Sequence, residues 1–239
     1  MPVIGLIGYV DKYDFAINLA KTINIMNKSV LVVDATLDRK LKYVIPALNN
    51  LGRAYVTQYN DIDFAVGFDS MHDVENYLAE QSINIGLYDY IIIDIDSPKS
   101  YEFFRTRGID KSYFFLDTSI LSLAKNRDII KAIRIYSQGQ EKDNLKLTKV
   151  VYKDVMSRAA EDYFQKQIEE YGIKWQEPEY MFPHDEMDKI VDIDSQYSGL
   201  IDVKRHTKLY LSNLADFTSE IIEDVTSKEV IKAIKRRRD

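Results

Sequence analysis

Apolar residues follow two patterns that alternate along the chain, short unbroken runs and longer stretches with helical spacing. The short runs show no polar alternation, which is typical of strands that are buried on both faces of a parallel sheet. Such runs predict strands at residues 3–8, 29–34, 54–58, 88–94, 112–116, 147–152 and 178–182. We expect the last of these strands at an edge of the sheet, because Pro178 has no N–H to donate to a neighbouring strand.

The stretches between these runs have the spacing of amphipathic helices. In residues 13–27, for example, apolar side chains recur at Phe15, Leu19, Ile23 and Met26. Further helices are predicted at residues 37–48, 70–81, 119–135, 157–172, 207–222 and 227–235. Because strand and helix alternate without a linker rich in Pro, Gly or Ser, we predict an α/β fold, doubly wound, with a mostly parallel sheet and helices on both faces. It forms a single domain over residues 1–226, and a basic helix or tail follows at 227–239.

Composition narrows the classes of function. The 239 residues are 46% hydrophobic and 29% charged, which suits one globular domain with a full core. The net charge of −6 gives no general attraction to nucleic acid. The absence of cysteine excludes disulfides, thiolate metal sites and cysteine nucleophiles. No apolar run approaches the roughly 20 residues of a membrane span, and no signal peptide is recognisable, so we expect a cytoplasmic protein.

Candidate chemistry lies where buried strands end. The turn at residues 8–14 follows the first strand, Asp34 ends the second, and Asp94 ends the strand at 88–94. In open α/β sheets, ligands bind at the carboxyl ends of the strands. An acid at such a position sits at the rim of the sheet, since burial without solvation is expensive. Two acids beside a strand–loop–helix unit form the minimal frame of a Mg-nucleotide site.

Five segments carry a resemblance to a known family. They read VIGLIGYVDKYDFAINLAKTI, KSVLVVDATLD, YDYIIIDIDSP, DKSYFFLDTSILSLAKNRDIIKAI and FPHDEMDKIVDIDSQYSG. In order and spacing they resemble the ParA/MinD family of deviant-Walker P-loop ATPases. The resemblance implies a P-loop NTPase fold, a site for ATP and Mg, and a homodimer. It also implies protein partners in a cytoplasmic or membrane-associated machine, such as a partitioning, pilus, secretion or conjugation complex.

The phosphate loop departs from the pattern of that family. The family reads Lys-Gly-Gly-x-Gly-Lys-Thr, whereas residues 7–13 read IGYVDKY. Gly8 and Lys12 keep the nucleotide-binding positions. The signature lysine is replaced by Ile7, two glycines by Tyr9 and Asp11, and the Mg-binding hydroxyl by Tyr13. A phosphate nest needs converging N–H groups and close approach, and Asp11 places negative charge where a polyphosphate would lie.

The resemblance also assigns the remaining residues of the site. It implies that Asp34 is the catalytic acid, here vestigial or weak, and that Asp94 and Asp34 would hold any Mg. The adenine-side asparagine of the family corresponds to Tyr152. ATP and Mg are the only cofactors implied, and the altered loop makes neither of them certain.

Each of these residues also has a plainer interpretation. Lys12 could be a solvated loop lysine, and Asp34 and Asp94 could be strand-terminal acids satisfied by helix N-termini. We interpret Asp96 as part of the turn before Pro98. The three histidines have no ligand spacing and are interpreted as solvated or core residues, namely His72, His184 and His206. The 17 tyrosines serve packing, or an exposed cluster of them serves as an interface anchor.

Residues 227–239 read SKEVIKAIKRRRD and place Val230, Ile231 and Ile234 on one helical face. MinD proteins end in an amphipathic membrane-targeting helix, which this tail resembles in outline. The alternatives are a helix that docks on the domain and ends in solvated charge, or a contact with DNA. Three hypotheses therefore stand: a non-catalytic adaptor in the cytoplasm or at the membrane periphery, a weak Mg-ATP-dependent dimerising ATPase switch, and a DNA-bound partitioning protein.

Overall fold

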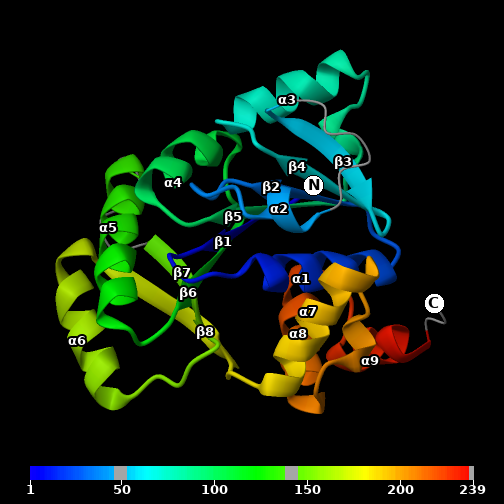
Figure 1. Cartoon of the computed structure of the whole chain (residues 1–239). Coiled ribbons are helices and arrows are strands. Elements are labelled where there is room, and N and C mark those ends of the chain that lie inside the picture. Colours follow the sequence, from blue (N-terminus) through cyan, green and yellow to red (C-terminus); the bar gives the residue numbers. More distant parts are fainter. Residues whose placement is uncertain (46–52, 138–144, 237–239) are drawn as a thin grey trace.

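The computed structural model describes residues 1–45, 53–137 and 145–236. In this part of the chain, one eight-stranded sheet has the order β3-β4-β2-β5-β1-β6-β7-β8 (Figure 1). Neighbouring strands are parallel except for β3 and β4, which are antiparallel. The strands are β1 (Val3–Ile7), β2 (Val30–Asp34), β3 (Tyr55–Tyr59), β4 (Ile62–Val66), β5 (Tyr90–Ile95), β6 (Lys111–Leu116), β7 (Leu145–Tyr152) and β8 (Ile173–Phe182).

Helices cover both faces of the sheet. They are α1 (Tyr13–Ile25), α2 (Leu41–Val44), α3 (Met71–Glu80), α4 (Pro98–Phe104), α5 (Ile120–Tyr136), α6 (Arg158–Ile168), α7 (Glu186–Ser198), α8 (Lys208–Ile221) and α9 (Ser227–Arg236). One buried cluster joins the sheet to α1, α8 and α9, and a second joins its other face to α3, α4, α5 and α6. Strands β1, β2 and β5 are buried along their whole length. The predicted doubly wound, mostly parallel α/β fold is confirmed.

The predicted strands and helices all have counterparts. Three of them differ clearly in length, and one of these is the helix predicted at 157–172, which is observed as α6 and ends at Ile168. The predicted helix at 37–48 is observed only as α2, and its residues 46–48 lie outside the described residues. Strand β8 is longer than predicted and begins at Ile173. It is an edge strand, as the proline predicted, and its register with β7 shifts between Thr148 and Val150.

Strand β4 and the helices α4 and α7 were not predicted, and each has a local signal. The β3–β4 hairpin turns at Asn60 and Asp61, which both have positive φ, as the tight turns of hairpins require. Helix α4 begins with Ser97 as its N-cap and proline at its first position. Helix α7 is capped by Asp185 and ended by Gly199 in the left-handed conformation.

Helix α9 packs onto the domain rather than standing apart from it. Val230 and Ile234 are buried in the cluster that also holds α1 and α8, and Ile231 packs against that cluster. The apolar face of this helix is therefore occupied within the chain. The exposed side carries cations, Lys228, Lys232, Lys235 and Arg236. Among the described residues, no helix is both long enough and apolar enough to cross a membrane.

Candidate functional site

The loop after β1 begins at Gly8, where the backbone conformation and the close packing allow only glycine. Gly8 has φ +142°, and a Cβ there would lie 2.2 Å from the carbonyl oxygen of Phe115. The N–H of Gly8 donates to Ile95 O at 2.9 Å, and the N–H of Tyr9 donates to Asn126 Oδ1 at 2.8 Å. Both N–H groups are thus used inside the protein, so neither is available to an anion in this arrangement.

Lys12 is buried and fully engaged, with only 1% of its surface exposed. Its Nζ donates to Gly8 O at 2.7 Å and to Ile95 O at 3.1 Å, and it forms an ion pair with Asp94 Oδ1 at 2.7 Å. An ammonium group has three N–H donors, and three oxygen atoms lie within reach of this one. The interpretation of Lys12 as a solvated loop lysine is therefore wrong.

The two strand-terminal acids lie side by side. Asp34 and Asp94 are register partners on the adjacent strands β2 and β5. Asp34 Oδ1 accepts from the N–H and the hydroxyl of Thr36 at 3.0 and 2.6 Å, and its Oδ2 accepts from Leu41 N–H at 2.8 Å. Burial, with a smaller contribution from the charge of Asp94, raises the pKa of Asp34 to about 6. Burial also raises the pKa of Asp94, although Lys12 opposes this shift.

These residues do not fit a Mg ion. Both carboxylate oxygens of Asp34 accept protein hydrogen bonds. Tyr13 occupies the position to which the resemblance assigns a Mg-binding hydroxyl, and its OH accepts from Gln196 Nε2 at 3.4 Å. In residues 1–45, 53–137 and 145–236, no group of three or more His, Asp or Glu side chains is arranged to hold a metal ion.

The position that the resemblance assigns to the adenine side is filled by the protein itself. Tyr152 is 1% exposed, and its hydroxyl donates to Asp14 Oδ1 at 2.8 Å. The cavity bordered by Tyr152, Lys153 and His184 holds about 10 Å³, and a second cavity beside Asp14 and Asp192 holds about 20 Å³. Ligand pockets typically occupy about 300–1,000 Å³. Each cavity has room for about one water molecule.

Asp11 lies on the surface of the loop. Its Oδ1 is 3.4 Å from Lys40 Nζ. Burial lowers the pKa of Lys40, but the carboxylates of Asp11, Asp96 and Asp94 together raise it above its ordinary value. Asp96 accepts from Leu37 N–H at 3.1 Å and from Ser100 Oγ at 3.4 Å, so it ties the turn before Pro98 to the segment after β2. The interpretation of Asp96 as a turn residue agrees with these contacts.

Sequence reasoning missed a buried polar network behind the loop. Asp14 accepts from Tyr152 and Lys153. Burial raises the pKa of Asp14, but Lys153 and the hydrogen bonds from Tyr152 and Phe15 together lower it below its ordinary value. Asn18 donates to Asp192 Oδ1 at 3.0 Å and to Tyr210 OH at 3.2 Å. The only sequence signal was an acid in the first turn of a helix, which is ordinary. This network occupies the space behind the start of α1.

The histidines divide as predicted into core and surface. His206 is buried, with Nδ1 3.2 Å from Asp188 Oδ1 and Nε2 3.6 Å from Asp192 Oδ1. Burial lowers the pKa of His206, although Asp188 opposes this shift. His72 and His184 are exposed.

Several solved structures have a similar fold. No protein-family model matches the sequence, and no curated protein matches it. A ParA family ATPase from Chlorobium tepidum TLS superposes with a TM-score of 0.60 at 17% identity, over 92% of this chain and 98% of that one. A chain of the MinC:MinD cell division protein complex of Aquifex aeolicus gives 0.57 at 12% identity, over 99% and 95%. Apo McdA from Cyanthece gives 0.53 at 13% identity, over 97% and 99%.

These neighbours, together with the strand–loop–helix unit at Gly8, show that the chain has a P-loop NTPase fold. Within that class the chain has a ParA/MinD-like fold. At these identities the comparison shows the fold and leaves the chemistry to the residues of the loop.

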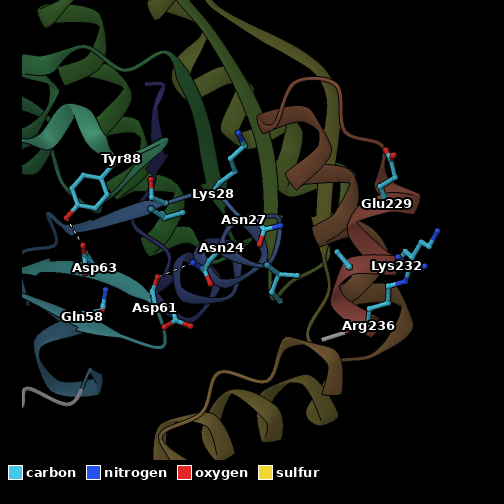
Figure 2. A pocket seen from close by; sticks show the side chains of 14 residues that line it. Asn24, Asn27, Lys28, Gln58, Asp61, Asp63, Tyr88, Glu229, Lys232 and Arg236 are labelled. Atoms are coloured by element: carbon cyan, nitrogen blue, oxygen red, sulfur yellow. Dashed lines mark hydrogen bonds between the residues drawn. The ribbon is translucent and has the colours of Figure 1, made fainter. Parts of the chain in front are cut away.

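A large hollow lies elsewhere on the molecule (Figure 2). This groove of about 980 Å³ is lined by the end of α1, by β3 and β4, and by α9. Its walls carry charges of both signs, Asp61 and Asp63 on one side and Lys232 and Arg236 on the other. It borders the start of β2, whereas Gly8, Asp34 and Asp94 lie at the opposite ends of the strands. The groove is therefore distinct from the predicted nucleotide site.

Proposed function

We propose that this chain is a non-catalytic adaptor, a ParA/MinD-like protein that localises or assembles a larger machine through protein contacts. The observation that carries the proposal is the buried ammonium group of Lys12, held by Gly8 O, Ile95 O and Asp94. A lysine used in this way does not reach a phosphate unless three contacts break. The filled adenine side at Tyr152 and the engaged oxygens of Asp34 support the same proposal.

One observation favours a second candidate, a weak or atypical Mg-ATP-dependent switch. Asp34 and Asp94 remain adjacent, and Lys12 remains beside them. If Lys12 left its pocket, the acids and the lysine would face one another across the loop. This candidate requires measurable nucleotide binding, and the adaptor requires none.

Calorimetry with Mg-ATP and Mg-ADP separates the two candidates. We expect no binding by the wild-type chain at millimolar nucleotide. A Kd in the micromolar range would overturn the adaptor. Lys12→Ala is unsuitable as the control, because it leaves Asp94 buried and unpaired. The better comparison is Tyr9→Gly with Asp11→Gly, two exposed loop positions at which the family has glycine. Binding gained by this double variant would identify the loop side chains as the cause of the loss.

A cellular test addresses the role of the retained acid. Asp34→Asn keeps the size of the side chain, and the adaptor predicts that activity in the cell is retained. A null phenotype from an Asp34→Asn variant that folds normally by circular dichroism would count against the adaptor.

The proposed partners are proteins of a cytoplasmic or membrane-associated machine. The likeness in fold to a chain of the MinC:MinD complex supports a protein partner. Membrane contact through α9 receives no support from its apolar face, since Val230 and Ile234 are buried. The exposed cations of α9 leave DNA as a third candidate. DNA binding that falls steeply with salt and is lost in Lys232→Ala with Lys235→Ala would favour it.

A further inference from the structure

Helix α7 has its polar and apolar residues on unexpected sides. Its buried residues are Asp188, Val191 and Asp192. Its outward side carries large apolar side chains at helical spacing, with exposed fractions of 61% for Met187, 48% for Ile190, 40% for Ile193 and 90% for Tyr197. Residues three and four positions apart share a helical face. These four side chains, which we name the α7 stripe, therefore form one line along the helix.

The buried aspartates fix the rotation of this helix. Asp188 accepts from Thr207 N–H at 2.7 Å and from the Thr207 hydroxyl at 2.9 Å. Asp192 accepts from Asn18 on α1 at 3.0 Å. Rolling the helix to bury the α7 stripe would turn both aspartates outward, break these bonds and leave the donors of Thr207 and of the buried Asn18 without acceptors, which is costly in the interior. The exposed stripe is therefore built into the fold.

The spacing of the stripe allows it to pair with a second copy of the same chain. Met187 and Tyr197 lie five residues on either side of position 192, and Ile190 and Ile193 lie two before it and one after it. A two-fold axis at the level of residue 192 therefore places Met187 opposite Tyr197, and Ile190 near Ile193, in an antiparallel pair of helices. Isologous contacts require this kind of self-complementary surface.

Charges beside the stripe are compatible with this pairing. The two copies of Glu186 would lie about 18 Å apart along the helix axis, at 1.5 Å per residue. Asp194 is paired with Arg205 Nη2 at 2.5 Å within the same chain. Lys189 would lie near the level of Gln196 of the other copy. Of these charges, the two copies of Asp194 would lie closest to the two-fold axis, about 6 Å apart along the helix axis, and each keeps its own partner Arg205.

One helix does not bury enough surface, and neighbouring apolar residues extend the stripe. A stable interface buries about 800 Å² on each partner. Leu200, 59% exposed, follows the stripe directly along the chain. Tyr43, 82% exposed, lies on α2, whose end borders the same small cavity as α7. In Figure 1, α7 lies in front of α1, with α2 above it.

We propose that the α7 stripe is the interface of a homodimer that forms without nucleotide, with the two α7 helices packed antiparallel. This inference goes beyond the adaptor function and does not depend on it, because no residue of the stripe belongs to the loop or contacts Lys12. A dimer could form whether or not nucleotide binds.

Sedimentation of the full chain across a range of protein concentrations tests the interface. We expect a dimer without nucleotide, and at least a tenfold weaker dimer for Ile190→Glu. The matched control is Leu87→Glu, which also adds a carboxylate at an exposed apolar position, 75% exposed, away from α7. This control should dimerise like the wild type. Circular dichroism melting of each variant separates loss of the dimer from loss of the fold.

Cysteine cross-linking locates the contact, since the native chain has no cysteine. Ile193→Cys lies one residue from the expected axis and should form a covalent dimer under mild oxidation. Leu121→Cys, at the start of α5 and 61% exposed, should not. Three outcomes would overturn the proposal: a monomer at every concentration, a dimer unaffected by Ile190→Glu, or a dimer cross-linked through residue 121 rather than 193. Calorimetry in the same buffer reports nucleotide binding separately, so failure of this interface and failure of the adaptor remain distinguishable.

Discussion

At the scale of residues, the most informative pair is Lys12 and Asp94. Their ion pair is buried at 1% and 2% side-chain exposure. We expect Lys12→Met to lower the free energy of unfolding by about 3–5 kcal/mol, because a buried carboxylate is left without its partner. Adding Asp94→Leu should recover most of this loss, since both charges are then removed. Urea denaturation of the two single variants and the double variant measures the coupling.

An unchanged stability of Lys12→Met would contradict this prediction. If Lys12→Met unfolded at the wild-type urea concentration, the ammonium group would be contributing nothing to the fold. Lys12 would then be free to serve a ligand, and the weak-switch candidate would gain support. The matched control is Lys125→Met on α5, a lysine with greater exposure.

A second prediction at this scale concerns pH. Burial, with the charge of Asp14, raises the pKa of Asp192 to about 7. A raised carboxyl pKa means that stability is fully present below the unfolded value near 4 and is lost as pH rises through 7. Asp192→Asn cannot titrate and can still accept from Asn18. We expect its loss of stability between pH 4 and pH 8 to be smaller by on the order of 2 kcal/mol, measured by urea denaturation at each pH.

Asp34 provides the comparison for that experiment. With a pKa of about 6, it gives the wild-type protein and the Asp192→Asn variant the same additional slope. An unchanged pH profile in Asp192→Asn would mean that the carboxylate at 192 is already ionised at pH 4, against the burial argument.

The positions of the site residues followed from the sequence, but their partners did not. Gly8, Asp34 and Asp94 were placed at one edge because parallel strands end there. Lys12 Nζ and Ile95 O, however, are 83 positions apart in the chain. A short-range pattern contains no information on whether a lysine reaches solvent or a distant carbonyl, so the burial of Lys12 could not be predicted.

At the scale of elements, α9 shows how an apolar face can be read in two ways. A short helix with Val230, Ile231 and Ile234 on one side fits a membrane surface or a docking site equally well. The structure places Val230 and Ile234 in the core. The composition of the helix alone could not show whether it docks on the domain or on a membrane, because the surface that receives it comes from α1 and α8.

This docking gives a prediction for the element. Ile234→Ala should destabilise the fold by about 2–4 kcal/mol, because it removes a buried side chain and leaves a cavity. Lys235→Ala, on the exposed side of the same helix, should change stability by less than about 0.5 kcal/mol. Thermal and urea unfolding of the two variants check this. Equal effects of both substitutions would contradict the observed rotation of the helix.

Helix α7 was missed because its pattern is inverted. Periodicity assigns the apolar side of a helix to the core, but here Asp188 and Asp192 lie inside with Thr207, His206 and Asn18 as partners. Those partners come from α1 and from the segment before α8. Departures of this kind mark surfaces kept for another purpose more often than errors in the local pattern.

At the scale of the whole molecule, the adaptor and the α7 dimer make a joint prediction for thermal unfolding. A ligand that binds only the folded state at 100 times its Kd adds about 2.7 kcal/mol, which would raise the Tm of a domain of this size by about 5–10 °C. We expect no such rise with 1 mM Mg-ATP. We do expect the Tm to rise with protein concentration, because the dimer also binds only the folded state. Calorimetric or fluorescence melting, with protein and nucleotide varied independently, measures both effects.

A Tm that responds to nucleotide concentration and not to protein concentration would indicate a working switch that does not dimerise without nucleotide, and both proposals would fail together. A Tm that responds to both would keep the α7 dimer and remove the adaptor. The response to protein concentration should disappear in Ile190→Glu and persist in Leu87→Glu, which ties the whole-molecule effect to a single helix.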